Sequence, residues 1–334
     1  MKRLCFLVIC MSIIMGCSTS TSSTKALVDY VDPNIGTAHC RWFFYTPAAI
    51  PFGMAKLAPS TDAHLGNPGG WQAVGYDFRH TSIEGFANFH EFQVGGVVFA
   101  PTVGELQTVP GELENPDGGY RSRFDKKDEV AAPGYYSVLL KDYGVKAELT
   151  AMKRVGFHRY TYPKTELANL IFDIGNKQGE SGEVKDAEVQ YFEDGRVEGY
   201  VITSPVYVNI YQKGADVRMY FSAVLNKKPV QVGTFVKDVV NPGKHQEKGP
   251  GAGLYMTFST EEQEAVAVKV GLSYTSIENA RFNRETEAAD VTFDQAKKNA
   301  TDVWNESLSR IYVEGGKETD KVKFYTGLFH ALLG

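Results

Sequence analysis

An aromatic and polar cluster lies between residues 41 and 96 of the 334-residue sequence. It comprises RWFFY at residues 41–45, Trp71 after a glycine-rich segment, GYDFRH at 75–80 and GFANFHEFQVGG at 85–96. The C–H face of a sugar stacks on aromatic rings, while amide, imidazole, guanidinium and carboxylate groups bind its hydroxyls with fixed geometry. The cluster therefore indicates a carbohydrate-binding site. For each residue alone, core packing or a loop-bracing hydrogen bond is the competing interpretation.

Three carboxylates of this region, Asp77, Glu84 and Glu91, are candidates for the acid and base of glycoside hydrolysis. Inverting hydrolysis needs two carboxyl groups about 6.5–9.5 Å apart on either side of one bond. Spacing along the chain does not show that any two of them converge, so the residues alone leave the pair open. The sequence contains no nucleophile elbow, no Walker sequence and no His-Glu-x-x-His pair.

The first 17 residues have the pattern of an export signal. Lys2 and Arg3 precede an apolar run at residues 4–15, which is shorter than the roughly 20 residues of a membrane-spanning helix. IMGC at residues 14–17 resembles a bacterial lipobox, so Cys17 is the expected lipidation site and residues 18–27 form a flexible tether. We expect an exported lipoprotein of the bacterial cell envelope, periplasmic or associated with the outer membrane. A plain signal peptide with an incidental cysteine is the alternative.

Composition and charge exclude several classes of protein. With 43% hydrophobic and 12% aromatic residues, the chain can bury a dense core, which excludes general disorder. Its formal net charge of −5 and the lack of a basic stripe argue against a nucleic-acid partner. An acidic chain does not adhere to anionic lipid by charge alone, so membrane contact is expected only through the lipid on Cys17.

The hydrophobic pattern divides the chain into a β part and a helical part. Short apolar or alternating runs, separated by turn-forming pairs, predict ten or more strands and a large antiparallel sandwich over residues 28–275. One of these predicted strands is the run at 207–213. A period of three to four residues then predicts a helical linker at 276–314 and a wide apolar helix within 315–334. Because this last helix needs apolar partners, we expect the chain to be the front part of a longer protein.

Several sequence blocks, in the same order, resemble glycoside hydrolase family 92, a family of exo-acting α-mannosidases. The first are VDPNIGT at residues 31–37, PAAIPFGM at 47–54 and LAPS at 57–60. The next block matches at Gly75-Tyr76, IEGF at 83–86 and His90, with Asn88 where many members carry a histidine. Further matches lie near the C-terminus: VGLSY at 270–274, Trp304-Asn305, VEGG at 313–316 and FYTGLFH at 324–330.

The resemblance implies a fold, a reaction and a set of site residues. It implies an N-terminal β-supersandwich, a helical linker and a C-terminal (α/α)6 toroid of which this chain holds the first helix. It implies calcium-dependent, inverting hydrolysis of mannose-containing glycans such as N-glycans or mannans, with the general acid, the base and the completed calcium site in the toroid beyond Gly334. Arg41 and Trp71 are then the expected sugar-binding residues, and Asn88, His90 and Glu91 are weaker candidates.

Two functions from different classes follow. The first is the N-terminal portion of an exported α-mannosidase, which contributes sugar-binding residues, has no catalytic residue of its own and is inactive alone. The second is a stand-alone carbohydrate-binding module without hydrolytic activity. A structural protein of the cell envelope with no sugar role is a third alternative.

Overall fold

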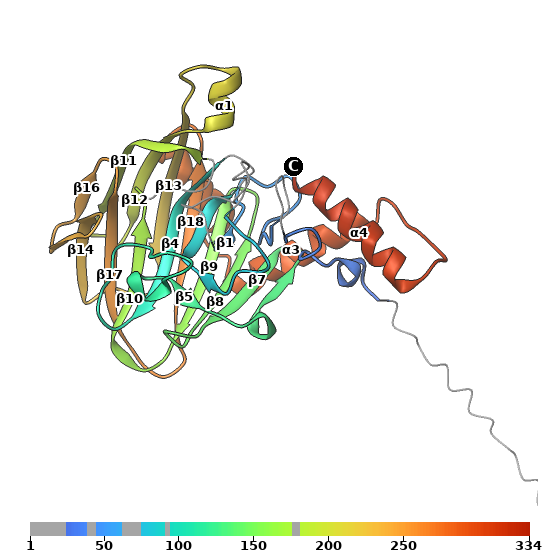
Figure 1. Ribbon diagram of the computed structural model, residues 1–334, viewed down its shortest axis with the longest axis horizontal. Helices are drawn as coiled ribbons and strands as arrows, with labels where there is room; N and C mark the ends of the chain where they lie inside the picture. The colour runs from blue at the N-terminus through green and yellow to red at the C-terminus, as the bar shows by residue number, and fades with distance from the viewer. Residues whose placement is uncertain (1–24, 39–44, 62–74, 91–93, 176–180) are drawn as a thin grey trace, which may run out of the picture.

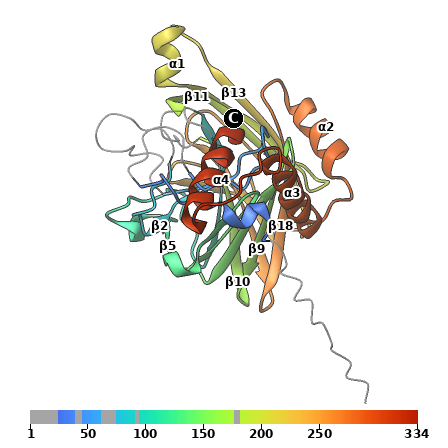
Figure 2. The ribbon, with the colours of Figure 1, turned by 90° about the vertical axis from the view of Figure 1, so that its right-hand side faces the viewer.

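The computed structural model describes residues 25–38, 45–61, 75–90, 94–175 and 181–334, apart from the side chains of Val206 and Tyr207. Within these ranges two antiparallel sheets face each other, and helices near the C-terminus pack outside one of them (Figures 1 and 2). A mainly β sandwich followed by helices is the fold class that the sequence predicts, and it is confirmed. None of the helices described is long and apolar enough to cross a membrane.

The first sheet has seven strands in the described residues. In spatial order they are β1 (Ala58–Ser60), β3 (Gly85–His90), β4 (Gly95–Val103), β10 (Thr165–Asp173), β17 (Ala252–Thr260), β14 (Gln231–Val236) and β15 (Val239–Pro242). Two short strands, β2 (Ser82–Ile83) and β5 (Ser122–Arg123), pair separately. Three 3-10 turns are η1 (Leu27–Tyr30), η2 (Pro116–Gly118) and η3 (Lys126–Asp128).

The second sheet has nine strands in the described residues. Their spatial order is β16 (Gln246–Lys248), β11 (Glu183–Tyr191), β12 (Val197–Ser204), β13 (Val217–Leu225), β18 (Glu264–Ser273), β9 (Val155–Tyr162), β8 (Val145–Ala151), β7 (Tyr135–Leu140) and β6 (Val130–Ala132). The core between the sheets is aromatic as well as aliphatic. The Phe172 ring lies 4.1 Å from that of Phe99 and 6.3 Å from that of Phe221, centroid to centroid, which joins β10 and β4 to β13 of the other sheet.

Three helices follow the last strand. α2 (Ile277–Ala288) packs on β18 and β13, and α3 (Phe293–Leu308) packs on β7, β8 and β9. The side chains of Ser276 and Thr292 cap the N-termini of these two helices. α4 (Glu318–Leu333) packs on α3 and on the N-terminal turn η1.

Residue pairs in the strand register show which loops share one end of the sandwich. Val98 of β4 faces Asp173 of β10, and Gly95 of the same strand faces His90 of β3. Glu183 of β11 faces Ser204 of β12, immediately before α1 (Val206–Tyr211). The C-terminal ends of β3 and β10 and the start of β11 therefore lie toward one end of the molecule, the end near α1 in Figure 1.

One predicted strand is wrong. The sequence pattern predicts an extended run at 207–213, but residues 206–211 form the helix α1. Its sequence, VYVNIY, is short and apolar at most positions, and such a run fits either conformation by its pattern alone. Asn209 stabilises the helix and the segment that follows it, because its Nδ2 donates to the main-chain oxygens of Pro205 (2.9 Å) and Ala215 (3.2 Å).

Candidate functional site

A cavity of about 420 Å³, which we call the helix-side cavity, lies where the sandwich meets α4. It is lined by Phe52, Gly53, Met54, Lys56, Lys153, Arg154, Tyr274, Leu333 and Gly334. Two main-chain hydrogen bonds form its walls: Phe52 N donates to Leu332 O (3.0 Å) and Met54 N to Lys153 O (2.7 Å). The cavity is thus lined by residues of the sandwich and residues at the end of the last helix. These residues are far apart in the sequence, and the fold brings them together.

The charged side chains that line this cavity are Lys56, Lys153 and Arg154. Lys56 is buried, and its Nζ donates to the main-chain oxygen of Gly334 (2.9 Å). Arg154 forms an ion pair with Glu287 of α2. No described Asp or Glu side chain lines this cavity, so its charged side chains are all cationic.

His90 ends β3, and Lys56, which lines the helix-side cavity, is close enough to act on the pKa of its ring. Its ring stacks on Tyr45 with centroids 4.5 Å apart, and the Tyr45 hydroxyl donates to the His90 main-chain oxygen (2.5 Å). Burial, with a smaller contribution from Lys56, lowers the pKa of His90 to about 3, so the ring is neutral at physiological pH. Its Nδ1 is buried without a hydrogen-bond partner among the described residues, a state that a bound water or ligand relieves.

Asn88 is fully buried between the two sheets. Its Nδ2 donates to Val97 O (2.7 Å), and its Oδ1 lies 2.8 Å from Nε2 of His158 on β9. Since Oδ1 can only accept, His158 carries its proton on Nε2, and its Nδ1 accepts from the Tyr160 hydroxyl (2.8 Å). Burial lowers the pKa of His158 to about 3. In this structure Asn88 therefore braces β3 against the second sheet, while its predicted contact with sugar remains a prediction.

The three other sugar-binding candidates, Arg41, Trp71 and Glu91, and the lipidation candidate Cys17 lie outside the described residues. The residues that flank Arg41, Trp71 and Glu91 nevertheless lie together. Thr61 N donates to Gly75 O (2.5 Å) across the ends of the Trp71 segment, and Phe78 N donates to Thr37 O (3.3 Å).

Tyr45, which follows the Arg41 segment, packs with Tyr76 and stacks on His90, the residue before Glu91. The described ends of all three segments thus meet in one region near the end of β3. Tyr45 belongs to the RWFFY cluster singled out in the sequence, whereas the sequence does not identify Phe52 or Lys56 as site residues. Phe52 belongs to the matched block at 47–54, and Lys56 lies between that block and the one at 57–60.

The two described carboxylates considered for catalysis are held in ion pairs. Glu84 and Arg121 are fully buried, with Oε2 and NH2 3.3 Å apart, and Ser60 Oγ donates to the other carboxylate oxygen (2.8 Å). Burial acts to raise the pKa of Asp77, but hydrogen bonds from Arg79 outweigh it and lower that pKa to about 2. Both groups lie next to the ends of the Trp71 segment. Arg121 also donates a hydrogen bond to Thr61 O, just before the segment, and Asp77 lies just after it.

The described residues do not fit a calcium ion. No group of three or more His, Cys, Asp or Glu side chains among them is placed to hold a metal. Calcium prefers carboxylate and carbonyl oxygens, whereas the helix-side cavity presents cations.

Solved structures identify the class of protein to which this architecture belongs. The chain is similar to the family GH92 alpha-mannosidase BT3965 from Bacteroides thetaiotaomicron, with 30% identity and a TM-score of 0.83 over 93% of this chain and 41% of that one. The complex of BT3965 with mannoimidazole gives 29% identity and a TM-score of 0.83, over 92% and 40% of the two chains. The GH92 family glycosyl hydrolase ccman5 gives 25% and 0.76, over 92% and 41%.

Family models agree with the structures. The model of the glycosyl hydrolase family 92 N-terminal domain matches residues 30–273, and that of the family 92 catalytic domain matches residues 279–334. The chain belongs to glycosyl hydrolase family 92, and it spans about two fifths of the length of the solved structures. A sequence comparison with curated proteins gives no match.

Proposed function

We propose that this chain is the sandwich-bearing part of an exported, calcium-dependent, inverting α-mannosidase that trims mannose from N-glycans or mannans. The observation that carries the proposal is the helix-side cavity, which is lined by residues of the N-terminal region together with Tyr274 and the end of α4. The similar protein BT3965 forms a complex with mannoimidazole, which supports a mannose-like ligand for this chain as well.

The chemistry of the cavity supports a role in sugar binding, and not in acid and base catalysis, for the residues of this chain. Arg41, Trp71, His90 and Glu91 would bind sugar, and Asn88 would hold the end of β3 in place. The carboxylates of Asp77 and Glu84 form ion pairs with Arg79 and Arg121. The charged side chains that line the cavity are cationic rather than acidic. Glycoside hydrolysis by inversion needs an acid and a base facing one bond. We therefore propose that residues 28–275, 276–314 and 315–334 are sandwich, linker and the start of the catalytic domain, and that the acid, the base and the calcium ligands belong to the remainder of that domain.

The test is release of an aryl group from an aryl α-mannoside in the presence of calcium. The chain alone should give no release above background, whereas a version extended through a complete catalytic domain should turn over and lose activity on chelation of calcium. The anomer first released, observed by proton NMR, should be inverted. Robust turnover by the chain alone would contradict the assignment of the acid and base to the rest of the domain.

The alternative of a stand-alone carbohydrate-binding module has a separate test. Calorimetry with mannose oligosaccharides should then give binding that Trp71→Ala abolishes, with no hydrolysis by the extended version either. Lipid anchoring is tested by Cys17→Ala, which should move the protein from the membrane fraction to the soluble fraction of cells. An unchanged distribution would contradict a lipid anchor at Cys17.

A further inference from the structure

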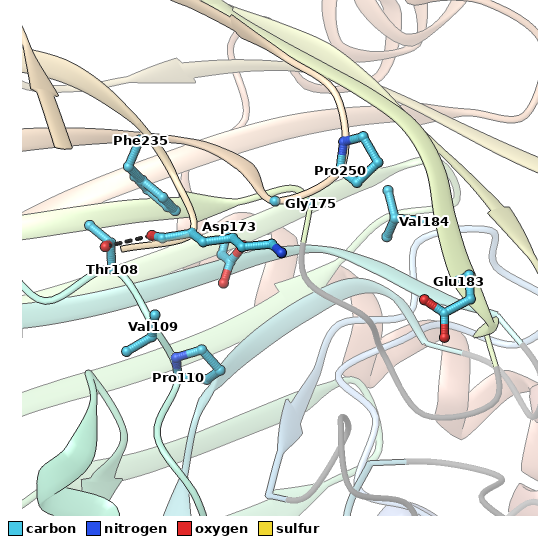
Figure 3. Close-up of a pocket in the computed structure, with 11 residues that line it drawn as sticks. Thr108, Val109, Pro110, Asp173, Gly175, Glu183, Val184, Phe235 and Pro250 are labelled. Atoms are coloured by element: carbon cyan, nitrogen blue, oxygen red, sulfur yellow. Dashed lines mark hydrogen bonds between the residues drawn. The ribbon is translucent and has the colours of Figure 1, made fainter. Parts of the chain in front are cut away.

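A second cavity, of about 380 Å³, lies at the ends of β10 and β14, next to the residues that precede β17 and to the start of β11. We call it the sheet-side cavity. Its described lining residues include none of those that line the helix-side cavity, and β14 and β17 lie on the side of the sandwich away from α4 (Figure 1). In Figure 3 Asp173 lies centrally, with Val109 and Pro110 on one side and Glu183 on another.

Close backbone contacts build the floor of the sheet-side cavity. Gly175 lies so near the opposing chain that a Cβ there would come within 2.4 Å of the main-chain nitrogens of Gly251 and Ala252. The Lys237 side chain covers Gly251, where an added Cβ would meet Lys237 Cγ at 2.8 Å. Two anchors fix Lys237: its main-chain N donates to Gly251 O (2.9 Å) and its O accepts from the Thr108 hydroxyl (2.7 Å). These contacts fix the main chain at Gly175, Lys237 and Gly251.

Lys237 itself adopts an unusual conformation. It has a φ of 54° in the turn between β14 and β15, in the left-handed region that is strained for a non-glycine residue. A glycine would fit this turn without strain. The lysine at this position places an ammonium group on the wall of a cavity that already contains two carboxylates.

Asp173 provides a buried carboxylate with a defined partner. The residue is only 4% exposed, and its Oδ2 accepts a hydrogen bond from the Tyr120 hydroxyl (2.6 Å). Burial, together with the charge of Asp173, raises the pKa of Tyr120 well above its usual value, so the hydroxyl stays protonated and keeps donating. Asp173 is thus held in one orientation.

The lining selects the chemistry of a ligand. Asp173 and Glu183 would repel an anion, and Lys237 would repel a cation. Val109 and Pro110, which are half-buried, offer an apolar surface that the C–H face of a pyranose can cover, and the fully buried Phe235 ring lies behind the wall. A purely apolar ligand would cover the charged side chains of the lining without making hydrogen bonds to them. A neutral molecule with several hydroxyls can both cover the apolar side chains and hydrogen-bond to the charged ones. The volume of the cavity also falls within the range of small-molecule sites.

We propose that the sheet-side cavity binds a neutral pyranose unit of a glycan, as a second carbohydrate site whose described lining residues differ from those of the helix-side cavity. Asp173 and Glu183 accept hydrogen bonds from sugar hydroxyls, and Lys237 donates one. The choice of mannose as the first probe rests on the proposed function, whereas the site itself rests on the lining of the cavity.

The experiment is NMR of the full chain with labelled valine methyl groups, titrated with methyl α-mannoside to about 50 mM, well above the ~1 mM dissociation constant of a weak site. The methyl signals of Val109 and Val184, which both line the cavity, should shift with a saturable dependence. Asp173→Asn keeps an acceptor for Tyr120, and Lys237→Met keeps the stem over Gly251. Each should weaken binding about tenfold or more.

Lys228→Met is the matched control, because Lys228 is exposed near the other end of β14. It should leave the titration unchanged. Methyl β-galactoside is the second arm: shifts with either sugar support a pyranose site, and shifts with neither overturn it. Trp71→Ala separates the two proposals, since it should leave the Val109 and Val184 shifts intact even if the helix-side cavity does not bind mannose at all.

Discussion

The helix-side and sheet-side cavities are of similar size but are assembled differently. The helix-side cavity joins segments from the N-terminal blocks, the turn between β8 and β9, and α4, and its charged side chains are cations. The sheet-side cavity is formed within the region of the N-terminal domain model, and its described lining combines two carboxylates with one lysine. The charged side chains of the first are thus of one sign, while those of the second are of both signs.

The difference extends to how each cavity is held in place. Near the helix-side cavity, buried histidines take part in the bracing: Asn88 links β3 to His158 on the opposite sheet, and Tyr45 packs on His90. At the sheet-side cavity, main-chain hydrogen bonds at Gly175 and Gly251 and the Tyr120–Asp173 hydrogen bond take that place. Substitutions and pH should therefore affect the two regions unequally.

The largest expected effect is that of Asn88→Ala. It would leave Val97 O and the Nε2–H of His158 buried without partners, at about 1–3 kcal/mol each. We expect the free energy of unfolding to fall by about 2–5 kcal/mol in urea denaturation. Asn226→Ala is the matched control, because Asn226 also makes two hydrogen bonds but is exposed, so water replaces them at a cost below about 1 kcal/mol. Equal losses in the free energy of unfolding for the two variants would show that the buried Asn88 side chain does not brace β3.

The particular residues also show how much could be predicted from the sequence. Alternating runs such as the one at 264–274 correctly predict a strand, and the apolar spacing of Phe293, Ala296, Ala300 and Trp304 correctly predicts α3. These features are local, so a pattern carries them. The run that forms α1 is also local, but it is too short for its pattern to separate strand from helix.

The candidate site was harder to predict from the sequence, because it depends on contacts between residues that are far apart along the chain. Asn88 and His158 are 70 residues apart, and Tyr120 and Asp173 are 53 apart. Nothing in the spacing of single residues indicates such pairs. The sheet-side cavity has no sequence signature at all, since its lining comes from several segments that only the sheet brings together.

The next effect in size is a loss of stability in acid. His90 and His158 have folded-state pKa values of about 3, against about 6.5 in the unfolded chain. Below pH 6.5 the unfolded state therefore binds protons that the folded state excludes. Stability should fall by about 1.4 kcal/mol per pH unit for each histidine below about pH 6.5, which is about 2 kcal/mol for each histidine at pH 5, with no contribution above pH 6.5.

Urea denaturation at pH 7 and pH 5 measures this slope, and His158→Gln isolates half of it. The glutamine amide can still donate to Asn88, but it does not titrate, so the slope should decrease by about the contribution of one histidine. Because none of the described residues that line the sheet-side cavity is a histidine, amide hydrogen exchange at pH 5 should accelerate in β3 and β9 before it does in β14 and β17. A slope unaffected by His158→Gln, or exchange that accelerates first in β14, would contradict the comparison.

The smallest effect concerns a feature that the two cavities share. Each has a non-glycine residue with positive φ in its lining: Phe52, with φ 53° and 64% exposed, at the helix-side cavity, and Lys237 at the sheet-side cavity. Glycine relieves the backbone strain of such a residue but adds about 0.5–1 kcal/mol of unfolded-state entropy. Phe52→Gly and Lys237→Gly should therefore each change the free energy of unfolding by no more than about 1 kcal/mol.

Gln263→Gly, at φ 60° in the turn between β17 and β18, is the reference for a turn remote from both cavities. If the strained residues are retained for their side chains, the three variants should have similar stability but different binding. Lys237→Gly should remove the sugar-dependent shifts of Val109 and Val184, and Phe52→Gly and Gln263→Gly should preserve them. A loss of those shifts in Phe52→Gly would mean that the two cavities are coupled, because Phe52 does not line the sheet-side cavity and could act on it only through the sandwich between them.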